Sequence, residues 1–428
     1  MMFKFIFKIG QKLRNPSLQK CYDFLKKSES WTLEQLEDYQ LKKLKEIINV
    51  AYFNTVYYKS KFDLAKVHPS DLKDLNDLKK FPILTKKEII ENVKNNHSNL
   101  KFKKLFSAST SGTTGQSLNF KRDENADSFN RASIFRGYSW HRVQPWERSG
   151  YFWGYNFNYL QKLKILVGDV LVNRFRLFKY DIKSVKKFIK KSKKAVYITG
   201  YASMIYQVAK IINTNKLNKP KNLKMIVGTS EKIFESYQSE VKKAFDLKII
   251  NEYGATETGI IAFECPYGKM HINMEGVIVE EIDNEIIVTN LQMLSFPVIR
   301  YKLGDFIKLS SRNLKCKCGK NHLILDDVMG RIGNVVYGFK STYPSLVFYY
   351  IFKNLANQNK LLLTYQVVQN KKGELNFLIV QKLNKAQLIM LENEIKKYFK
   401  KDIKFEIWDS YNLAIGKKKT QNFISKIK

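Results

Sequence analysis

The chain has 428 residues, which is too long for one compact core and predicts at least two domains. Hydrophobic residues make up 44% of the chain, which excludes global disorder, and no apolar run is long enough to span a membrane. The net charge of +36 favours a polyanionic neighbour, although a lysine-rich composition alone also explains part of the excess. Because no RNA- or DNA-binding motif accompanies the charge, we expect no specific nucleic-acid partner.

The N-terminus has no small-residue cleavage site, and its apolar run is too short for a secretory signal. The four cysteines do not form a secreted disulfide pattern, so we expect a cytoplasmic protein. Helical spacing in residues 1–13 separates a basic face from an apolar face: Lys4, Lys8 and Lys12 on one, Phe5, Ile6, Ile9 and Leu13 on the other. Such a helix either lies on the inner, anionic membrane surface or packs on the body of the protein.

Residues 32–60 follow a helical pattern that Thr32 can cap, and Thr85 with Glu88 has the spacing of a capping box. From residue 195 onward, short apolar strands alternate with helices, which predicts an α/β domain with a parallel-rich sheet. We expect strands at 195–199, 224–227 and 247–250, helices at 203–213 and 232–245, and a hairpin over 276–290.

The pattern changes after Gly330. A helix at 343–355, strands at 361–368 and 375–380, a helix at 385–400 and a strand at 404–408 make a small α+β unit with the order αββαβ. The sequence therefore predicts a large N-terminal domain over residues 1–331 and a small, mobile C-terminal lid domain over residues 332–428, with a hinge near 331–342.

Four short motifs can carry chemistry. Ser109-Thr-Ser-Gly-Thr-Thr-Gly115 offers amide and hydroxyl donors to phosphate, although a flexible Ser/Thr/Gly loop is the alternative. Asn251-Glu-Tyr-Gly-Ala-Thr-Glu257 follows a predicted strand, and its terminal carboxylate is a ligand type that Mg²⁺ prefers. Asp305 ends the run Phe296-Pro-Val-Ile-Arg-Tyr-Lys-Leu-Gly-Asp305 and can accept hydrogen bonds from ribose hydroxyls. A lysine after Gly416 can stabilise a transferring phosphoryl group; Lys417 follows the glycine directly and is favoured, and Lys418 and Lys419 are the alternatives. Each motif alone is also typical of an ordinary turn or a solvated charge run.

In their order and spacing, these motifs resemble the adenylate-forming superfamily, which includes the acyl-CoA synthetases. More narrowly, the chain is similar to the phenylacetate–CoA ligase branch and to CapK-type proteins of capsular polysaccharide loci. Gln40-Leu-x-x-Leu44, Phe81-Pro-Ile-Leu-Thr-Lys86 and Gly200-Tyr-Ala-Ser203 extend the resemblance, which runs from about residue 32 to the end. It implies a ligase that uses ATP to form an acyl-adenylate and passes the acyl group to coenzyme A or to a lipid-linked saccharide.

The resemblance also implies roles for individual residues. It implies that Lys417 acts in catalysis, that Glu257 is the Mg²⁺ ligand and that Thr256 contacts the α-phosphate. It also implies that Asp305 and Arg331 bind the ribose. The resemblance implies that the nucleotide phosphates are bound by Thr110, Ser111, Gly112, Thr113, Thr114 and Gly115. It further implies that the adenine is contacted and the acyl pocket is lined by Gly228, Thr229, Ser230, Glu231, Tyr253 and Gly254.

One departure from the family bears on the second half-reaction. The family's hinge reads Gly-Arg-x-Asp-Asp, whereas this chain has Gly330-Arg-Ile-Gly-Asn334 and lacks both acids. The alternative hypothesis is therefore a non-catalytic, nucleotide-binding relative of the phenylacetate–CoA ligases.

A separate cluster of possible metal ligands lies within residues 265–318. Cys265, His271, Cys316 and Cys318 supply three thiolates and one imidazole, the ligand set of a closed, structural Zn²⁺ site. His322 is a rival ligand, and free buried thiols are the alternative.

Overall fold

Capping residues begin several helices where the sequence predicts them. Thr32 forms a capping box with Gln35 and starts α3 (Leu33–Asn54), and Thr85 does the same with Glu88 at α5 (Lys86–Glu91). The helical pattern predicted over 32–60 is confirmed and forms two helices. Thr55 is extended and caps a second helix, α4 (Val56–Leu64), because its hydroxyl accepts a hydrogen bond from the amide of Tyr58.

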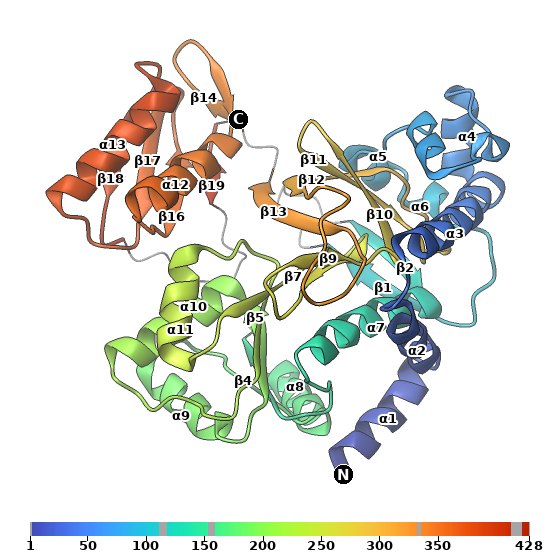
Figure 1. Cartoon of the computed structure of the whole chain (residues 1–428), viewed down its shortest axis with the longest axis horizontal. Helices are drawn as coiled ribbons and strands as arrows, with labels where there is room; N and C mark the ends of the chain where they lie inside the picture. Colours follow the sequence, from blue (N-terminus) through green and yellow to red (C-terminus); the bar gives the residue numbers. More distant parts are fainter. Residues whose placement is uncertain (1, 111–117, 153–158, 332–334, 412–421, 428) are drawn as a thin grey trace.

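The computed structural model describes residues 2–110, 118–152, 159–331, 335–411 and 422–427 (Figure 1). Within these residues, no helix is both long enough and apolar enough to cross a bilayer. The remaining elements of the N-terminal third are α1 (Met2–Arg14), α2 (Leu18–Ser28), η1 (Pro69–Asp71), η2 (Leu75–Lys80), α6 (Val93–Asn96), β1 (Leu105–Ser109), β2 (Asn119–Asp123) and α7 (Glu124–Trp140).

The centre of the molecule is one mixed sheet of 11 strands in the order β10-β11-β12-β13-β9-β8-β7-β6-β5-β3-β4. Its parallel half contains β3 (Ser149–Phe152), β4 (Arg174–Arg176), β5 (Tyr197–Tyr201), β6 (Met225–Thr229) and the start of β7 (Ile249–Ala255). The helices of this half are α8 (Tyr159–Leu171), α9 (Ile182–Ser192), α10 (Ala202–Thr214) and α11 (Glu235–Phe245). The predicted α/β fold with a parallel-rich sheet is confirmed.

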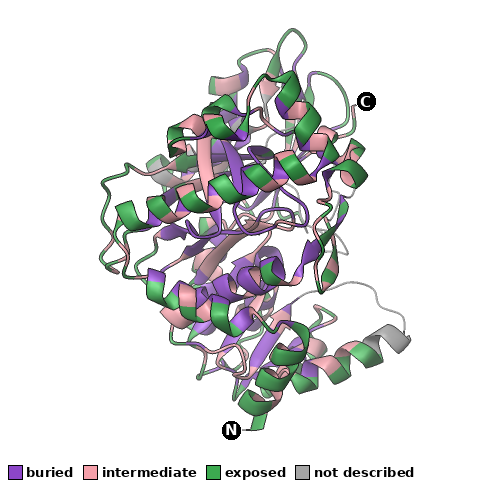
Figure 2. Cartoon of the chain, turned by 90° about the vertical axis from the view of Figure 1, so that its right-hand side faces the viewer, coloured by how far each residue is buried: buried purple, intermediate pink, exposed green. Residues whose placement is uncertain are grey.

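The antiparallel half carries the motifs closer to the C-terminus. It contains β8 (Gly259–Glu264), β9 (Met270–Ile272), β10 (Val277–Ile282), β11 (Glu285–Asn290), β12 (Tyr301–Leu309) and β13 (Ile324–Arg331). The predicted hairpin is β10 and β11, which pair from Val277↔Asn290 to Ile282↔Glu285. The buried side chains of both halves gather along the sheet, and the outer faces of the covering helices are exposed (Figure 2).

A second, four-stranded sheet has its own hydrophobic core. Its order is β18-β17-β16-β19, from β16 (Tyr365–Gln369), β17 (Glu374–Ile379), β18 (Lys404–Trp408) and β19 (Phe423–Ser425). The helices α12 (Leu346–Asn359) and α13 (Lys385–Phe399) pack on it, and a small hairpin of β14 (Val335–Tyr337) and β15 (Thr342–Pro344) precedes them. The αββαβ order is as predicted, whereas β19 was not predicted.

The two sheets touch through a small set of side chains. Phe234, just before α11, packs on Tyr365 of β16 with ring centroids 5.4 Å apart, and the hydroxyls of Ser236 and Thr364 are 2.6 Å apart. Tyr349 of α12 donates to Asp327 of β13. These contacts hold α12 and β16 against the end of the large sheet.

Candidate active site

The described candidate residues gather where β6, β7 and β12 end or bend. Ser111, Gly112, Thr113, Thr114 and Gly115 lie outside the described residues, as does Lys417. Thr110 is described, and its hydroxyl accepts a hydrogen bond from the amide of Leu118 at 2.9 Å. Since β1 pairs with β2 from Leu105↔Asp123 to Ser109↔Asn119, residues 110–118 connect the two strands of a hairpin.

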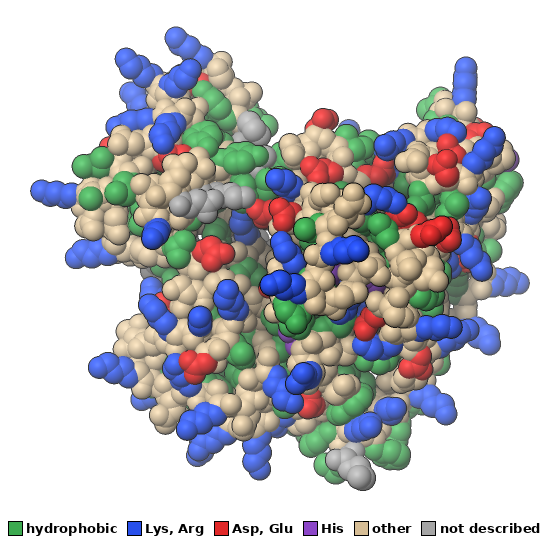
Figure 3. Space-filling view, in the orientation of Figure 1, with side chains coloured by type: hydrophobic (Ala, Val, Ile, Leu, Met, Phe, Trp, Pro, Cys, Tyr) green, Lys and Arg blue, Asp and Glu red, His purple; other side chains and the backbone are tan. Residues whose placement is uncertain are grey.

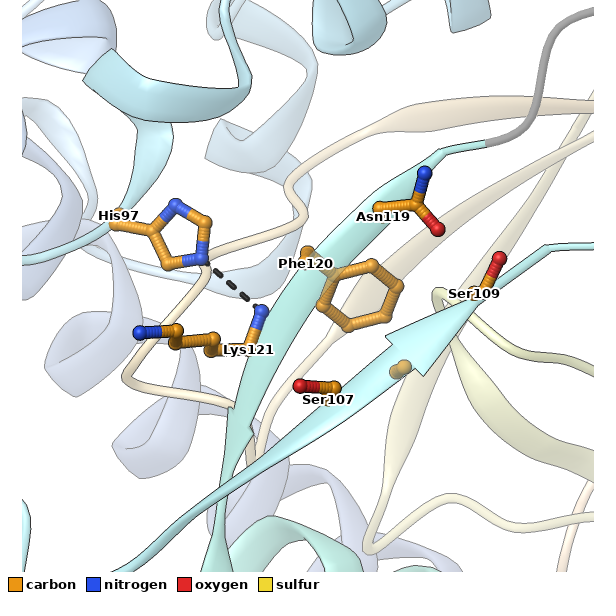
Figure 4. A pocket seen from close by; sticks show the side chains of 7 residues that line it. His97, Ser107, Ser109, Asn119, Phe120 and Lys121 are labelled. Atoms are coloured by element: carbon orange, nitrogen blue, oxygen red, sulfur yellow. Dashed lines mark hydrogen bonds between the residues drawn. The ribbon is translucent and has the colours of Figure 1, made fainter.

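A shallow hollow lies against this hairpin (Figure 4). Its wall includes Ser109, Asn119 and His97, and the Nε2 of His97 accepts the backbone N–H of Lys121 at 3.0 Å. The Nδ1 of the same ring lies 2.7 Å from the carbonyl oxygen of Val93, so it is the donor and the ring is a neutral imidazole. His97 therefore fixes the base of the hairpin.

The structure brings Tyr253, Asp305 and the backbone of Arg331 together. The hydroxyl of Tyr253 on β7 donates to Oδ2 of Asp305 on β12 at 2.8 Å. Asp305 is opposite Arg331 in the pairing of β12 with β13. Three predicted nucleotide-binding residues that are up to 78 positions apart in the sequence therefore meet on inner strands of the large sheet.

Glu257 and Thr256 follow β7 directly. The side chain of Glu257 is 7% exposed, and its Oε1 accepts the hydroxyl of Tyr301 at 3.1 Å. The backbone carbonyl of Thr256 accepts a hydrogen bond from the guanidinium of Arg122. Arg122 and Tyr301 were not predicted as site residues: Arg122 belongs to no motif, and Tyr301 lies in the motif that ends at Asp305 but was given no role of its own.

The strand predicted at 247–250 continues into the motif that was expected to follow it. Tyr253 and Gly254 lie inside β7, where Gly254 pairs with Ile260 of β8. A Cβ on Gly254 would lie 2.5 Å from the carbonyl oxygen of Gly259, so this glycine permits a close approach of two strands. The motif therefore extends along the sheet before the chain turns at Thr256.

Residues 228–231 end β6 and begin the next loop. Ser230 has a positive φ of 67°, so the chain leaves the strand sharply at this residue. Glu231 then points back toward α10, where Oε2 accepts the amide N–H of Ser203 at 2.8 Å. The loop is thus fixed to the first turn of the neighbouring helix.

A half-buried acid, Glu252, lies beside these residues on β7. Burial raises the pKa of Glu252 to about 7, and a hydrogen bond from Thr229 opposes the shift only in part. The pKa values of Tyr138 and Tyr151 are raised too, first by burial and then by the nearby charge of Glu252. Glu252 was not predicted as a functional residue, because the sequence alone does not show its burial.

The four predicted metal ligands also come together. The ligand atoms of Cys265, His271, Cys316 and Cys318 all lie within 4.8 Å of one another. The two sulfurs of Cys265 and Cys316 are 3.7 Å apart, and Nε2 of His271 is 3.1 Å from the sulfur of Cys318. Because Zn–S bonds are about 2.3 Å long, ligand atoms of a tetrahedral zinc lie about 3.5–3.8 Å apart. The Cys265–Cys316 separation matches this spacing, and the ligand types are those of a structural zinc site.

The protonation and orientation of His271 also suit a ligand. Burial lowers the pKa of His271 to about 4, which keeps the imidazole neutral, and raises that of the Cys265 thiol to about 12. The Nδ1 of His271 faces the carbonyl oxygen of His322 at 3.3 Å, which leaves Nε2 to face the sulfurs.

The side chain of the rival ligand His322 points elsewhere. Its Nε2 lies 2.9 Å from Oε1 of Glu275, a fully buried carboxylate that also pairs with Arg136 at 2.6 Å. Although burial alone raises the pKa of Glu275, Arg136 and His322 outweigh this effect and lower it below its usual value. His322 therefore belongs to a buried ion-pair network behind the cysteine cluster.

Solved structures identify the class of fold. A 2-hydroxyisobutyryl-CoA ligase in the postadenylation state, in complex with R3-HIB-AMP, superposes with a TM-score of 0.70. The sequence identity is 16%, and the match covers 93% of this chain and 91% of the ligase. The chain thus has the fold of the adenylate-forming ligases. A search against protein-family models finds no match.

Curated sequences place the chain more narrowly as a distant relative of two proteins. It is 24% identical to Protein CapK of Staphylococcus aureus over 285 residues, which span 61% of this chain and 60% of CapK. It is 41% identical to phenylacetate-coenzyme A ligase of Escherichia coli over 64 residues, or 15% of each chain. The predicted resemblance is confirmed at this distance.

The same solved ligase in other states superposes less well. With 2-HIB-AMP and CoA in the thioesterification state, its TM-score is 0.57, although the match covers the same 93% and 91% of the two chains. In an open conformation, the TM-score is 0.60. Among these three structures, the TM-score is therefore highest for the postadenylation state.

Proposed function

We propose that this protein uses ATP to activate a carboxylic acid as its acyl-adenylate. The observation that carries the proposal is the meeting of Tyr253, Asp305 and Arg331 beside Glu257, in an adenylate-forming fold. The distant similarity to CapK and to phenylacetate-coenzyme A ligase supports the same class of reaction.

In this proposal, the nucleotide lies across the ends of β6, β7 and β12. Residues 110–115 hold the phosphates, residues 228–231 border the adenine and the acyl pocket, and Tyr253 contacts the adenine. Asp305 and Arg331 hold the ribose, so the Tyr253 hydroxyl keeps the Asp305 carboxylate aimed at the two ribose oxygens. Thr256 contacts the α-phosphate, and Arg122 fixes its position through the backbone carbonyl.

The chemical step is an in-line displacement at the α-phosphorus. An oxygen of the substrate carboxylate bonds to that phosphorus, and the bond to the leaving pyrophosphate breaks. Glu257 would hold Mg²⁺, which neutralises phosphate charge when bound, and its buried carboxylate oriented by Tyr301 is a suitable oxygen ligand. Lys417 stabilises the charge that develops on the transferring group, so positioning and charge neutralisation supply most of the acceleration.

For the second step, we propose two domains, residues 1–331 and 332–428, with the second acting as a mobile lid. The few side-chain contacts between the sheets, such as Phe234 with Tyr365, suit an interface that can open. The acyl group then passes to coenzyme A or to another acceptor. The distant CapK match favours an acceptor in surface polysaccharide assembly, such as a lipid-linked saccharide.

We further propose that the cysteine cluster binds a structural zinc. With three thiolates and one imidazole, it leaves no open coordination position for a substrate. Its role is to join the end of β8 and the start of β9 to the loop before β13.

The direct test is ATP–pyrophosphate exchange by the purified chain with Mg²⁺ and a panel of aryl, hydroxy and amino acids. We expect exchange with one class of acid. We expect the variants Glu257→Gln and Lys417→Ala to reduce kcat/KM at least about 100-fold, because each removes charge stabilisation at the reacting phosphate.

The matched controls are Glu374→Gln and Lys401→Ala, which change exposed residues of the small sheet and of the loop before β18. They should retain full exchange. Nucleotide binding without exchange for any acid would contradict the proposal and favour the non-catalytic relative. Stimulation of product formation by coenzyme A would identify the second substrate.

A further inference from the structure

The helix α8 turns its apolar side outward. Leu163, Leu166, Val167, Val170 and Leu171 are 44% to 66% exposed, and their spacing of three and four residues places them on one face. A helix in a globular protein normally turns such a face toward the core. Among the residues that the structure describes, no side chain therefore covers the apolar face of α8.

The opposite side of α8 is anchored by charge. Asp169 is 1% exposed, and its two carboxylate oxygens accept hydrogen bonds from Arg174 at 2.6 Å and from Arg176 at 3.0 Å. Both arginines belong to β4, so this ion pair fixes which face of the helix looks inward. The outward orientation of the apolar face is thus set by a buried salt bridge.

The N-terminal helix α1 lies next to α8 and extends the same kind of surface. Phe7 packs against Phe135 and Trp146, with ring centroids 5.7 and 5.9 Å apart, so α1 does pack on the body of the protein. Its other apolar side chains remain outside: Met2, Phe5, Ile9 and Leu13 are 45% to 75% exposed. The alternative that this helix packs on the body of the protein is therefore confirmed at Phe7, whereas contact with a membrane surface stays a prediction.

Positive charge surrounds this apolar surface. α1 carries exposed Lys4, Lys8 and Lys12 and no acidic residue. At the same lower end of the molecule in Figure 1, the outer face of α9 consists of exposed lysines: Lys183, Lys186, Lys187, Lys190 and Lys191. Figure 3 shows hydrophobic side chains near the N-terminus with lysine and arginine side chains along the same lower edge.

We propose that α1 and α8 together form a docking surface for an anionic phospholipid bilayer. The exposed apolar side chains enter the interface between headgroups and acyl chains, and the lysines of α1 and α9 contact the lipid phosphates. A second copy of the chain is a poor occupant, because it would bring the same lysines and a net charge of +36 to the contact. A bilayer supplies both the apolar layer and the opposite charge.

The test is co-sedimentation of the full chain with vesicles, in the absence of ATP. One set of vesicles contains phosphatidylglycerol and phosphatidylcholine in equal parts, and the other contains phosphatidylcholine alone. We expect binding to the anionic vesicles that falls as salt is raised, because salt screens the contacts between lysine and phosphate. Absence of binding to anionic vesicles overturns the proposal.

Two double variants separate the apolar contribution from the charged one. Phe5→Ser with Val170→Ser should weaken vesicle binding at least about tenfold, because two apolar side chains that enter the bilayer are lost. Lys8→Glu with Lys12→Glu should weaken it at least about 25-fold, at about fivefold or more for each lysine near the surface. The ATP–pyrophosphate exchange of both variants in lipid-free buffer should be unchanged.

The matched control is Leu64→Ser with Lys66→Glu, at the far end of α4, where Leu64 is 87% exposed. It should bind vesicles as the unchanged chain does. An equal loss in this control overturns the proposal, because the effect would then reflect charge and hydrophobicity anywhere on the surface. A lipid-free dimer that the Phe5→Ser and Val170→Ser variant abolishes also overturns it, in favour of a second copy.

Discussion

Glu257 and Glu275 are both buried acids near the central sheet, yet their surroundings differ. Glu275 is fully buried and receives hydrogen bonds from Arg136, His322 and Ser28. Glu257 accepts the hydroxyl of Tyr301, and among the described residues no ion pair involves it.

This difference separates an acid that belongs to the structure from one that is available to a ligand. A buried carboxylate without a cation costs free energy, so a positive charge bound beside it stabilises the fold. The charge of Glu275 is neutralised by Arg136, whereas Glu257 lies near the charge of Arg122 but forms no ion pair among the described residues. In the proposed function, this difference leaves Glu257 available to a metal ion. Four predictions sharpen this comparison.

The largest expected effect comes from removing the cation of the internal pair. Arg136→Met leaves the charge of Glu275 buried and uncompensated, and we expect the free energy of unfolding to fall by about 3–5 kcal/mol. Urea unfolding measures the loss. The control Arg312→Met removes an exposed arginine that pairs with Glu37 and should cost less than about 1 kcal/mol. Equal losses in the two variants would show that the buried ion pair contributes no more to the free energy of unfolding than an exposed one.

The cysteine cluster next to this network gives the second prediction. We expect the purified chain to contain zinc in equimolar amount, and Cys316→Ser to lose that zinc and to lower the Tm by several degrees, because metal binding contributes to folding. Elemental analysis and thermal unfolding are the measurements. Cys21→Ser, which changes a buried thiol on α2, should keep the metal. Zinc retained by Cys316→Ser would exclude this ligand set.

The third prediction concerns pH. Because the pKa of Glu252 is raised to about 7 in the folded chain from an ordinary value of 4.5, the folded state binds the proton more tightly. The contribution of Glu252 to stability is therefore fully present below about pH 4.5 and is lost as the pH rises through 7. Glu252→Gln should remove this loss and stabilise the chain at pH 8 by about 2 kcal/mol relative to the unchanged sequence.

Unfolding of both forms in urea at pH 5 and pH 8 checks this prediction. Glu240→Gln, on α11, is the control and should follow the pH dependence of the unchanged chain. A stability difference between the unchanged chain and Glu252→Gln that does not vary with pH would contradict the assignment.

The smallest effect is expected at Tyr253. Tyr253→Phe removes the hydroxyl that holds Asp305 but keeps the ring, so we expect the KM for ATP to rise about fivefold with kcat nearly unchanged. Steady-state exchange kinetics measure both constants. Tyr267→Phe, at a residue that is 59% exposed, is the control. A fall in kcat alone would place Tyr253 in the chemical step.

Local chemistry explains which parts of the fold could be predicted from the sequence. Thr32 and Thr85 begin helices because their hydroxyls accept amide hydrogen bonds within the next three residues. The hairpin of β10 and β11 forms around Asp283 and Asn284, which both have positive φ. β19 escaped prediction because its partner, β16, lies more than 50 positions earlier in the chain.

Some features of the candidate site could likewise be predicted from the sequence, and others could not. The motif around Tyr253 could be located in the sequence, but its continuation as a strand depends on the approach of Gly254 to Gly259, which no local pattern shows. Arg122 could not be assigned, because its partner, the carbonyl of Thr256, lies 134 positions away. The cysteine cluster could be predicted, since its ligand types are distinctive, whereas only the structure separates His271 from His322.

The position of β19 has a consequence for folding during synthesis. β16 pairs in parallel with β19 from Val367↔Phe423 to Gln369↔Ser425, and β19 leaves the ribosome after every other strand of its sheet. Until then, β16 presents an unpaired edge, which is the part of a sheet most prone to pair with another chain. A nascent or truncated chain that stops before Phe423 should therefore aggregate through the small sheet while its large sheet folds normally.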